Sequence, residues 1–495
     1  MEMQWKVTPC RYLHTALREV QNQEQTLELR LTEGMPDIGR VLCAWGQPQL
    51  REKQWRTEEI GLSGGIAAWV LYIPEDGSQP RCVEGWIPFQ GKWRLPRDCR
   101  EGFIRADVRL RSIDARALSS RKMLVRASFA LLGEALEPRE VSVSQPEQVP
   151  EHIQLLQKTY PVNMVKEAGE KLFTLEDQLT LPIQQGKLLS CRMACQVTEQ
   201  AVTGSRVVLR GVLRPTYVYA GEDGRLYSGT QEILFAQFGE LTGEYDKEAT
   251  AEVSMVFADG TCSLEADTLR IKCDLIAQYT IRDRCLLQIA EDAYSHCRTL
   301  QSESAALELP VLLDHSQQNM EGTLEAEIAA EQVVDVDFLP DHPIHYRQDG
   351  DQIVEIPGMF QTLYYDGDGQ LQTIHHSWAG HWKLPAEENC QFAMTAEQIS
   401  QPTAMLLGER IRFQTELAMD VYTTAMQEMV MLTELRQGET VEVDPRRPSL
   451  ILRRAESLSL WELAKNCGST VEAIVKANGL VGEPDPQLLL LIPVL

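Results

Sequence analysis

The sequence predicts a mainly β protein, with three β-sandwich-like repeats followed by a small α+β module of order strand, helix, helix, strand. Three observations support this. Short runs in which apolar and polar residues alternate recur along residues 1–443, as half-buried antiparallel strands require. Aromatic runs end in an Asp-Gly turn at nearly constant spacing, and apolar residues at helical spacing are concentrated in residues 446–495.

Each repeat shows the same order of strand signals. The opening run alternates apolar residues and starts, in the three repeats, at Leu27, Leu179 and Leu307. An aromatic strand then enters a turn that ends, in the three repeats, at Gly77, Gly224 and Gly369. These glycines are 147 and 145 residues apart. Glycine tolerates the positive φ angle of a tight hairpin, so each Asp-Gly pair predicts a hairpin. The closing alternating runs are residues 121–129, 269–275 and 410–417.

Three stretches are interpreted as linkers because they are polar or carry prolines. They are residues 138–150, 298–306 and 444–448. The predicted domains are three β repeats and one C-terminal module, at residues 1–137, 151–298, 303–443 and 446–495.

The C-terminal module has a different periodicity. Residues 450–454 and 488–493 are predicted to be strands. Between them we expect two short helices, the first capped by Ser459 and stopped by Gly468, the second starting after Thr470 and leaving through Asn478-Gly479.

The charge of the chain limits its partners. The formal net charge is −25, although residues 446–495 carry six Lys/Arg and five Asp/Glu, a net of +1. Such an acidic surface repels nucleic acid and anionic lipid, so neither is an expected partner. The sequence has no run of about 18 apolar residues and no signal-peptide pattern at its start, so we expect no membrane insertion and a cytoplasmic protein.

No pattern of catalytic or metal-binding residues stands out. Phosphate-loop, zinc-protease, nucleophile-elbow and dinucleotide motifs do not occur, so we expect no enzyme activity, no catalytic residues and no cofactor. The twelve cysteines form no CxxC pair and are interpreted as core residues. The basic residues Arg105, Arg121, Lys122 and Arg126 are interpreted as a solvated strand face. Five histidines of the third repeat are interpreted as turn or surface residues rather than zinc ligands: His342, His345, His375, His376 and His381.

The C-terminal module resembles the LysM family. The resemblance is carried by residues 460–465 (Leu-Trp-Glu-Leu-Ala-Lys), 470–474 (Thr-Val-Glu-Ala-Ile), 477–480 (Ala-Asn-Gly-Leu) and 491–493 (Leu-Ile-Pro). It implies binding of N-acetylglucosamine glycans such as peptidoglycan, through the loops before the first helix and the last strand. Here the first loop, residues 455–459, lacks the usual glycine, which makes a protein partner at least as good an expectation.

Two sets of residues in this module are therefore singled out. The loop residues expected to contact a partner are Glu456, Ser457, Leu458, Val481 and Glu483. The residues expected to hold the module together are Trp461, Leu463, Asn478 and Gly479.

The repeats resemble the SPOCS domain, a spore-coat-associated repeat of endospore-forming bacteria. The resemblance is carried by residues 36–42, 114–116, 121–127 and 171–177. SPOCS repeats followed by a LysM module imply a protein of spore morphogenesis, located in the mother-cell cytoplasm at the forespore surface. The partner implied for the LysM module is the spore coat-scaffold ATPase.

Three functions are compared on these grounds. The expected one is a non-catalytic structural adaptor of endospore coat assembly, held at the forespore by contact between its LysM tail and a coat protein. The alternative is a protein that binds peptidoglycan of the cortex or cell wall. A glycan-active enzyme is the least favoured, because no acid/base pair of carboxylates stands out in the sequence.

Overall fold

The computed structural model describes residues 4–181, 186–385, 389–441, 446–455 and 458–495. Strands account for 77% of the structure and helices for 3%, and the sheets are built from antiparallel strands. The prediction of a mainly β protein is therefore confirmed. In these described ranges, no helix has the length and apolarity needed to cross a membrane.

The three repeats share one strand order in the sheet that contains their first and last strands. In each repeat the last strand lies at the centre of this sheet and pairs with the first strand on one side and with a late strand on the other. The orders are β1-β6-β5, β7-β12-β11 and β13-β20-β18. A second sheet in each repeat is formed by the intervening strands, in the orders β2-β3-β4, β10-β8-β9 and β14-β16-β15, with β17 also pairing with β16. Each repeat thus forms two antiparallel sheets, one that contains its first and last strands and one built from strands between them.

The bounds of the elements are as follows. The first repeat holds β1 (Trp5–Arg30), β2 (Ile38–Arg56), β3 (Glu59–Pro74), β4 (Arg81–Arg94), β5 (Phe103–Ser119) and β6 (Lys122–Pro146). The second holds β7 (Ile153–Thr180), β8 (Lys187–Ala220), β9 (Leu226–Thr230), β10 (Ile233–Tyr245), β11 (Thr250–Glu265) and β12 (Thr268–Ser295). The third holds β13 (Arg298–Glu327), β14 (Ala330–Pro340), β15 (Ile344–Gln348), β16 (Asp351–Asp366), β17 (Leu371–Leu384), β18 (Gln391–Gln398), β19 (Thr403–Leu407) and β20 (Arg410–Thr440). The C-terminal module holds β21 (Leu450–Arg454), α1 (Leu460–Cys467), α2 (Val471–Asn478) and β22 (Leu489–Pro493).

The three predicted Asp-Gly hairpins are confirmed. Gly77, Gly224 and Gly369 have φ angles of 71°, 79° and 73°, and each lies between two strands that pair with each other. Each of these glycine N–H groups also donates a hydrogen bond to the carbonyl of the residue three positions earlier, at 3.2, 3.0 and 2.9 Å. A side chain at these positions would be strained, because L-residues rarely adopt that φ.

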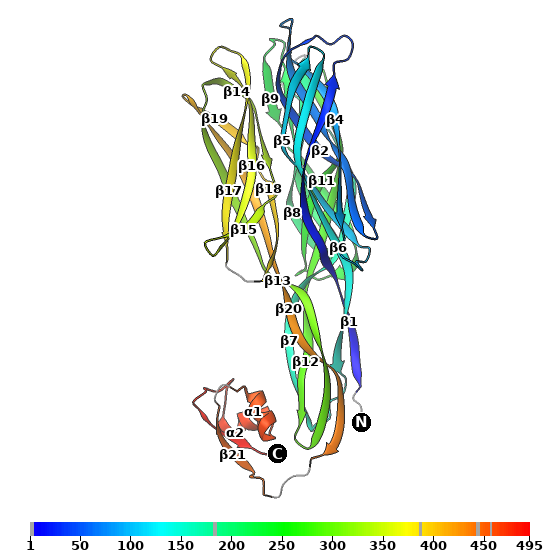
Figure 1. The fold of residues 1–495 in the computed structure, drawn as a ribbon, viewed down its shortest axis with the longest axis vertical. Helices are drawn as coiled ribbons and strands as arrows, with labels where there is room; N and C mark the ends of the chain where they lie inside the picture. Colours follow the sequence, from blue (N-terminus) through cyan, green and yellow to red (C-terminus); the bar gives the residue numbers. More distant parts are fainter. Residues whose placement is uncertain (1–3, 182–185, 386–388, 442–445, 456–457) are drawn as a thin grey trace.

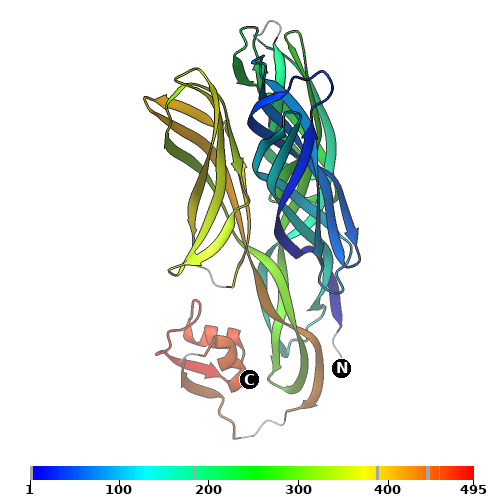
Figure 2. The same cartoon turned by 45° about the horizontal axis from the view of Figure 1, so that its top comes forward.

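The first and last strands of each repeat continue below the repeats into a shared stem (Figures 1 and 2). We call the paired segments beyond the bodies of the repeats the stem: residues 5–14, 137–146, 153–164, 283–295, 298–311 and 425–440. Here β1 pairs with β6, β7 with β12 and β13 with β20, as three two-stranded ribbons. A lone two-stranded ribbon is marginally stable in water. The ribbons therefore bury their inward side chains against one another, in a core that includes Val143, Val162, Ile289, Leu309 and Met429.

A β-bulge marks the junction of stem and body in each repeat. At this junction the register shift leaves one residue of each ribbon without a partner, namely Ala16, Lys166 and Leu313. A bulge bends a strand and increases its twist. Its recurrence at the same point in three ribbons gives each repeat the same bend where the stem opens into the body.

Two of the expected linkers are strands instead. Residues 138–146 lie at the end of β6, with Pro138 opposite Leu13 and Pro146 opposite Trp5, and residues 298–306 begin β13. Proline lacks an N–H but is tolerated where one side of a strand has no hydrogen-bonding neighbour. In the stem β6 pairs with β1 alone, so its prolines fit. Residues 444 and 445 of the third expected linker lie outside the described residues.

The second sheets of the three repeats (β2-β3-β4, β10-β8-β9 and β14-β16-β15 with β17) share a core with one another. Leu71, Val218 and Leu363 are buried together in it and lie 147 and 145 residues apart, the same spacings as the turn glycines. Beside them, three polar side chains, one from each repeat, meet in the interior. Arg192 on β8 donates to both carboxylate oxygens of Asp335 on β14, at 3.0 and 2.9 Å, and the Trp45 indole N–H on β2 donates to Asp335 at 3.2 Å.

We predict that Arg192→Met strongly destabilises the protein. It leaves the Asp335 carboxylate buried without its cation, and breaking a buried ion pair on one side costs about 3–5 kcal/mol. Thermal unfolding followed by circular dichroism measures this. Arg210→Met on the same strand is the control, because Arg210 and its partner Glu199 are both exposed. Equal melting temperatures for the two variants would contradict the structural role of Arg192.

Candidate functional site: the C-terminal module and the charged interior

The C-terminal module folds as two helices against a two-stranded antiparallel sheet, β21 with β22. The predicted helix signals are confirmed. Ser459 caps α1 in a capping box with Glu462, and Gly468 ends the helix in the left-handed conformation at a φ of 60°. The Thr470 hydroxyl caps α2, which ends at Gly479 with a φ of 61°. These caps satisfy backbone groups that a helix leaves unpaired at its ends.

Three of the four residues expected to hold the module together make their contacts within it. Leu463 is fully buried between the helices and the sheet. The Asn478 amide donates to the carbonyls of Ile474 and Leu491 at 2.8 and 2.7 Å and accepts from the Leu491 N–H at 2.8 Å. It therefore ties the end of α2 to β22, while Gly479 supplies the left-handed turn that follows.

Trp461, the fourth, attaches the module to the stem. Its indole N–H donates to Asp292 of β12 at 2.8 Å, and its ring packs edge-on against Tyr294, with ring centroids 4.8 Å apart. Lys465 of α1 ion-pairs with the same Asp292 carboxylate at 2.6 Å, and the Tyr294 hydroxyl donates to the Ser469 carbonyl at 3.0 Å. In Figure 1 the module accordingly lies beside the lower end of the stem.

Asp292 is the centre of this contact. Burial acts to raise the pKa of its carboxyl, but the hydrogen bonds from Lys465 and Trp461 outweigh burial and hold the pKa below its usual value. The β12 register shifts between Ala290 and Asp292, so the contact follows directly on a bulge. No sequence pattern marks a residue in the second repeat as the anchor for a module about 170 positions later.

The five residues predicted to contact a partner are placed differently from one another. Glu456 and Ser457 lie outside the described residues. Leu458 is half-buried and packs against the module core. Glu483 accepts a hydrogen bond from the Leu460 N–H at 3.0 Å and so joins the second loop to the start of α1. Val481 is fully exposed. Of the described loop residues, Val481 is therefore the one that presents its whole side chain to solvent.

An apolar surface on the other side of the sheet was missed by the sequence analysis. Ile451, Leu490 and Ile492 face the helices. The alternate residues point away, and we call them the leucine face: Leu450, Leu452, Leu489 and Leu491, with Arg454 opposite Leu489. The first three are 48%, 63% and 56% exposed. The alternation in residues 450–454 and 488–493 indicated strands, but a run of leucines does not show which ones remain uncovered.

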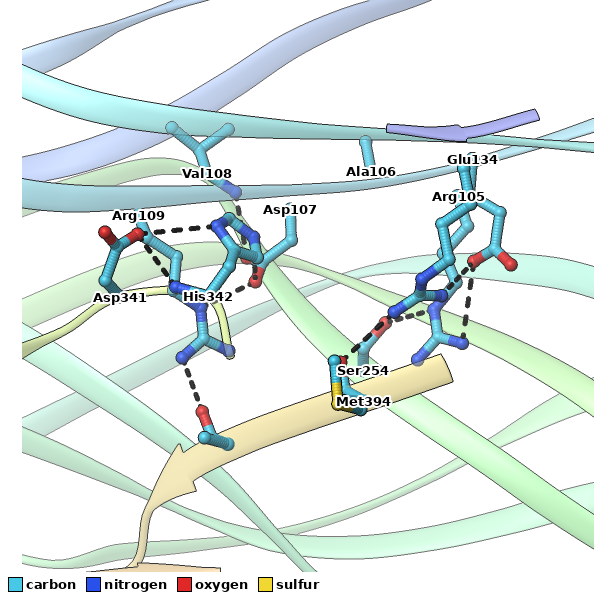
Figure 3. A network of polar contacts seen from close by, with 12 residues as sticks. Arg105, Ala106, Asp107, Val108, Arg109, Glu134, Ser254, Asp341, His342 and Met394 are labelled. Carbon is cyan, nitrogen blue, oxygen red and sulfur yellow. Dashed lines mark hydrogen bonds and ion pairs between the residues drawn. The ribbon is translucent and has the colours of Figure 1, made fainter. Parts of the chain in front are cut away.

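A second group of charged residues is buried between the repeats (Figure 3). Arg105 on β5 ion-pairs with Glu252 on β11 and lies 4.0 Å from Glu134, which also pairs with Arg18 at 2.8 Å. Arg105 was expected on a solvated face, and this interpretation is wrong, since the residue is buried. The charge is retained inside because carboxylates of the first and second repeats surround it.

The positions in this network follow the repeat. Arg105, Glu252 and Glu397 are 147 and 145 residues apart and lie on the equivalent strands β5, β11 and β18. All three line one cavity of about 450 Å³. Burial raises the pKa of Glu397 to about 7, against the opposing charge of Arg109. The equal spacing of charged residues is a signal that a repeat alignment of this sequence would have revealed.

Histidine also takes part in the interior. His342 lies 3.3 Å from Asp107, whose other neighbour is Arg109 at 2.8 Å (Figure 3). Burial acts to raise the pKa of Asp107, but the charge of Arg109 and the hydrogen bond from His342 hold it well below its usual range. His342 is therefore a buried residue rather than a turn or surface one. Within the described part of the chain, no three His, Cys, Asp or Glu side chains are grouped so as to hold a metal ion.

Comparisons of the chain with protein-family models, with curated proteins and with solved structures find no match. Function is therefore argued from the geometry. Buried ionisable groups with shifted pKa values occur at catalytic sites and in structural ion-pair networks alike. Here Arg105–Glu252 and Asp107–His342 join strands of different repeats, and Arg18–Glu134 joins β1 to β6, so these pairs contribute to holding the body together.

We predict that Asp292→Ala releases the module from the stem while leaving its fold intact. The substitution removes the acceptor of Trp461 and the ion partner of Lys465. Small-angle scattering should then show a larger radius of gyration than for the unsubstituted protein. Glu472→Ala, at an exposed position of α2, is the control and should leave the radius unchanged. An unchanged radius for Asp292→Ala would show that other contacts fix the module.

We predict that Glu397→Gln stabilises the protein above neutral pH. The raised pKa means that the folded state favours the protonated carboxyl, so its stabilising contribution is present below about pH 4.5 and is lost as pH rises through about 7. The glutamine variant should gain up to about 3 kcal/mol at pH 8 and nothing at pH 4. Melting temperatures at both pH values test this. Exposed Glu199→Gln should show no such pH dependence, and a pH-independent difference for Glu397→Gln would contradict the assignment.

Proposed function

We propose that this chain is a non-catalytic adaptor of endospore coat assembly, with three SPOCS-like repeats as a rigid body and a LysM-like module that contacts a protein partner at the forespore surface. The observation that carries this proposal is the leucine face. Residues 450–454 and 489–493 present leucines to solvent on the side of the sheet away from the helices, where the stem does not cover them.

An exposed apolar sheet face favours a protein partner. Burying apolar surface contributes about 25 cal/mol per Å², and protein contacts commonly centre on such a patch with polar residues at the rim. Sugar rings, in contrast, are held by hydrogen-bonding groups in a concave loop region. The leucine face lies on a two-stranded sheet rather than on loops, and Arg454 is the polar residue on the same side of that sheet.

The charge distribution supports a partner with an acidic rim. The module carries a net charge of +1 on a chain of −25, and Arg454 lies among the exposed leucines. An apolar surface bordered by carboxylates would match both features, and electrostatic complementarity sets specificity and association rate. We propose that the coat-scaffold ATPase implied by the family resemblance is such a partner.

The placement of the module supports the same function. Trp461 and Lys465 hold α1 against the stem, so the module is fixed beside the lower end of an elongated molecule (Figure 1). A fixed orientation reduces the freedom lost on binding and therefore favours affinity. The loop before the last strand is one of the loops associated with glycan binding in LysM modules. In it, Glu483 accepts a hydrogen bond from the start of α1, whereas Val481 is exposed and is the described loop residue that could contact a ligand there.

We predict that Leu452→Asp abolishes recruitment to the forespore. A carboxylate in the middle of the leucine face opposes burial against a partner, and because Leu452 is exposed the module should stay folded. Fluorescent fusions of the full chain in sporulating cells should form a shell around the forespore, and Leu452→Asp should disperse it. Native circular dichroism of the purified variant excludes unfolding.

Val481→Asp is the matched variant, since it places the same charge on an exposed apolar residue of the loop instead of the sheet. It should leave the shell intact. Binding of the purified protein to isolated peptidoglycan that is lost in Val481→Asp and retained in Leu452→Asp would overturn the proposal and favour the glycan-binding alternative. Leu458→Asp is less informative, because Leu458 packs on the module core.

A further inference from the structure

Two thiols and a lysine from two repeats converge in the stem. Cys10 lies on β1 of the first repeat, and Cys285 lies on β12 of the second. The Lys166 ammonium, on β7, is 3.9 Å from the Cys10 sulfur and 4.0 Å from the Cys285 sulfur. It also donates to the Arg11 carbonyl at 3.1 Å, which fixes it between the two strands. Lys166 is the bulge residue of its ribbon, so its position follows from the junction of stem and body.

The surroundings make the two sulfurs chemically different. The hydrogen bond from Cys285 and then the charge of Lys166 outweigh burial and lower the pKa of Cys10 to about 6. The same hydrogen bond and burial raise the pKa of Cys285. Asp283 on β12 and Tyr12 on β1 are the other titratable groups close to the pair. Cys10 is therefore the sulfur of the pair that ionises more readily to the nucleophilic thiolate, and Cys285 is the thiol beside it.

We propose that Cys10 and Cys285 form a redox-active pair, in which a hydroperoxide oxidises Cys10 and Cys285 then closes a disulfide between the first and second repeats. The Cys10 thiolate attacks the peroxide O–O bond and becomes a sulfenic acid, while the leaving oxygen takes a proton and departs as water or an alcohol. The Cys285 sulfur then attacks the Cys10 sulfur, the S–O bond breaks, and the hydroxyl leaves as water with the Cys285 proton. Two thiols are oxidised by two electrons and one hydroperoxide is reduced.

Access and partner proximity suit this chemistry. Cys10 is 8% exposed and Cys285 is half-buried, so the pair is open only to a small oxidant such as a peroxide, and the Cys285 thiol already hydrogen-bonds to Cys10. A disulfide here would tie β1 to β12, two strands from different repeats that do not pair with each other. It would add a covalent link to the non-covalent core of the stem and lower the entropy of the unfolded chain.

A second thiol pair in the same chain provides an internal control. The sulfurs of Cys191 on β8 and Cys262 on β11 are 2.8 Å apart, both within the second repeat. The hydrogen bond with Cys262 and burial raise the pKa of Cys191 well above its usual value, and no lysine lies between the two sulfurs in the contacts described. Proximity alone would therefore favour this pair, whereas thiolate reactivity favours Cys10 and Cys285.

The test is peroxide oxidation of the reduced, full-length protein at pH 7, followed by alkylation, digestion and mass spectrometry. We expect a Cys10–Cys285 cross-linked peptide to form about ten times faster than a Cys191–Cys262 one, in line with the greater reactivity of a thiolate. We also expect the alkylation rate of Cys10 to reach its half-maximum near pH 6. Faster formation of the Cys191–Cys262 link, or an alkylation midpoint above pH 8, would overturn the proposal.

Variants separate the three roles. Cys285→Ser should stop at the sulfenic acid, which dimedone traps on Cys10, and Cys10→Ser should leave Cys285 unoxidised. Lys166→Arg retains the positive charge and should keep the rapid oxidation, while Lys166→Met should slow it and move the alkylation midpoint to higher pH. Equal oxidation rates in Lys166→Met and the unsubstituted protein would overturn the role of the lysine.

Discussion

The structure depends on polar side chains that are buried between the repeats and are contributed by different repeats. Asp335 of the third repeat accepts hydrogen bonds from the guanidinium of Arg192 in the second repeat and from the indole N–H of Trp45 in the first. An isolated repeat would bury such a group without its partners or expose it, and either state is costly. The charges therefore select one arrangement of the three repeats, in which each repeat completes the interior of the others.

The stem and the module follow from that arrangement. Once the bodies are fixed around a shared core, bulges at Ala16, Lys166 and Leu313 direct three ribbons into one stem, where they bury apolar side chains that no ribbon could bury alone. The stem in turn supplies Asp292 and Tyr294 to Trp461 of the module. The leucine face is thus positioned through a chain of contacts that begins between the repeats.

The sequence predicted the features whose signals are local. The three Asp-Gly turns and the caps at Ser459 and Thr470 are fixed by backbone conformation within a few residues, and all are confirmed. Features that depend on the surroundings of a strand were not predicted. The prolines of residues 138–146 suggested a linker, because their fit depends on β6 having one neighbour in the stem. Likewise, the alternation around Arg105 does not reveal that its polar face meets Glu252 of another repeat.

The same limit applies to the candidate site. Caps and packing within the module were predictable, whereas the uncovered state of Leu452 and the attachment through Trp461 are tertiary outcomes.

The buried charges shared between the repeats imply that the three repeats form one cooperative unit. Scanning calorimetry of the full chain tests it most directly, with the C-terminal module followed separately by its own probe. One transition for residues 5–440, with equal calorimetric and van't Hoff enthalpies, is the predicted result. Three separable transitions would contradict the account, because the repeats would then be stable without their shared buried charges.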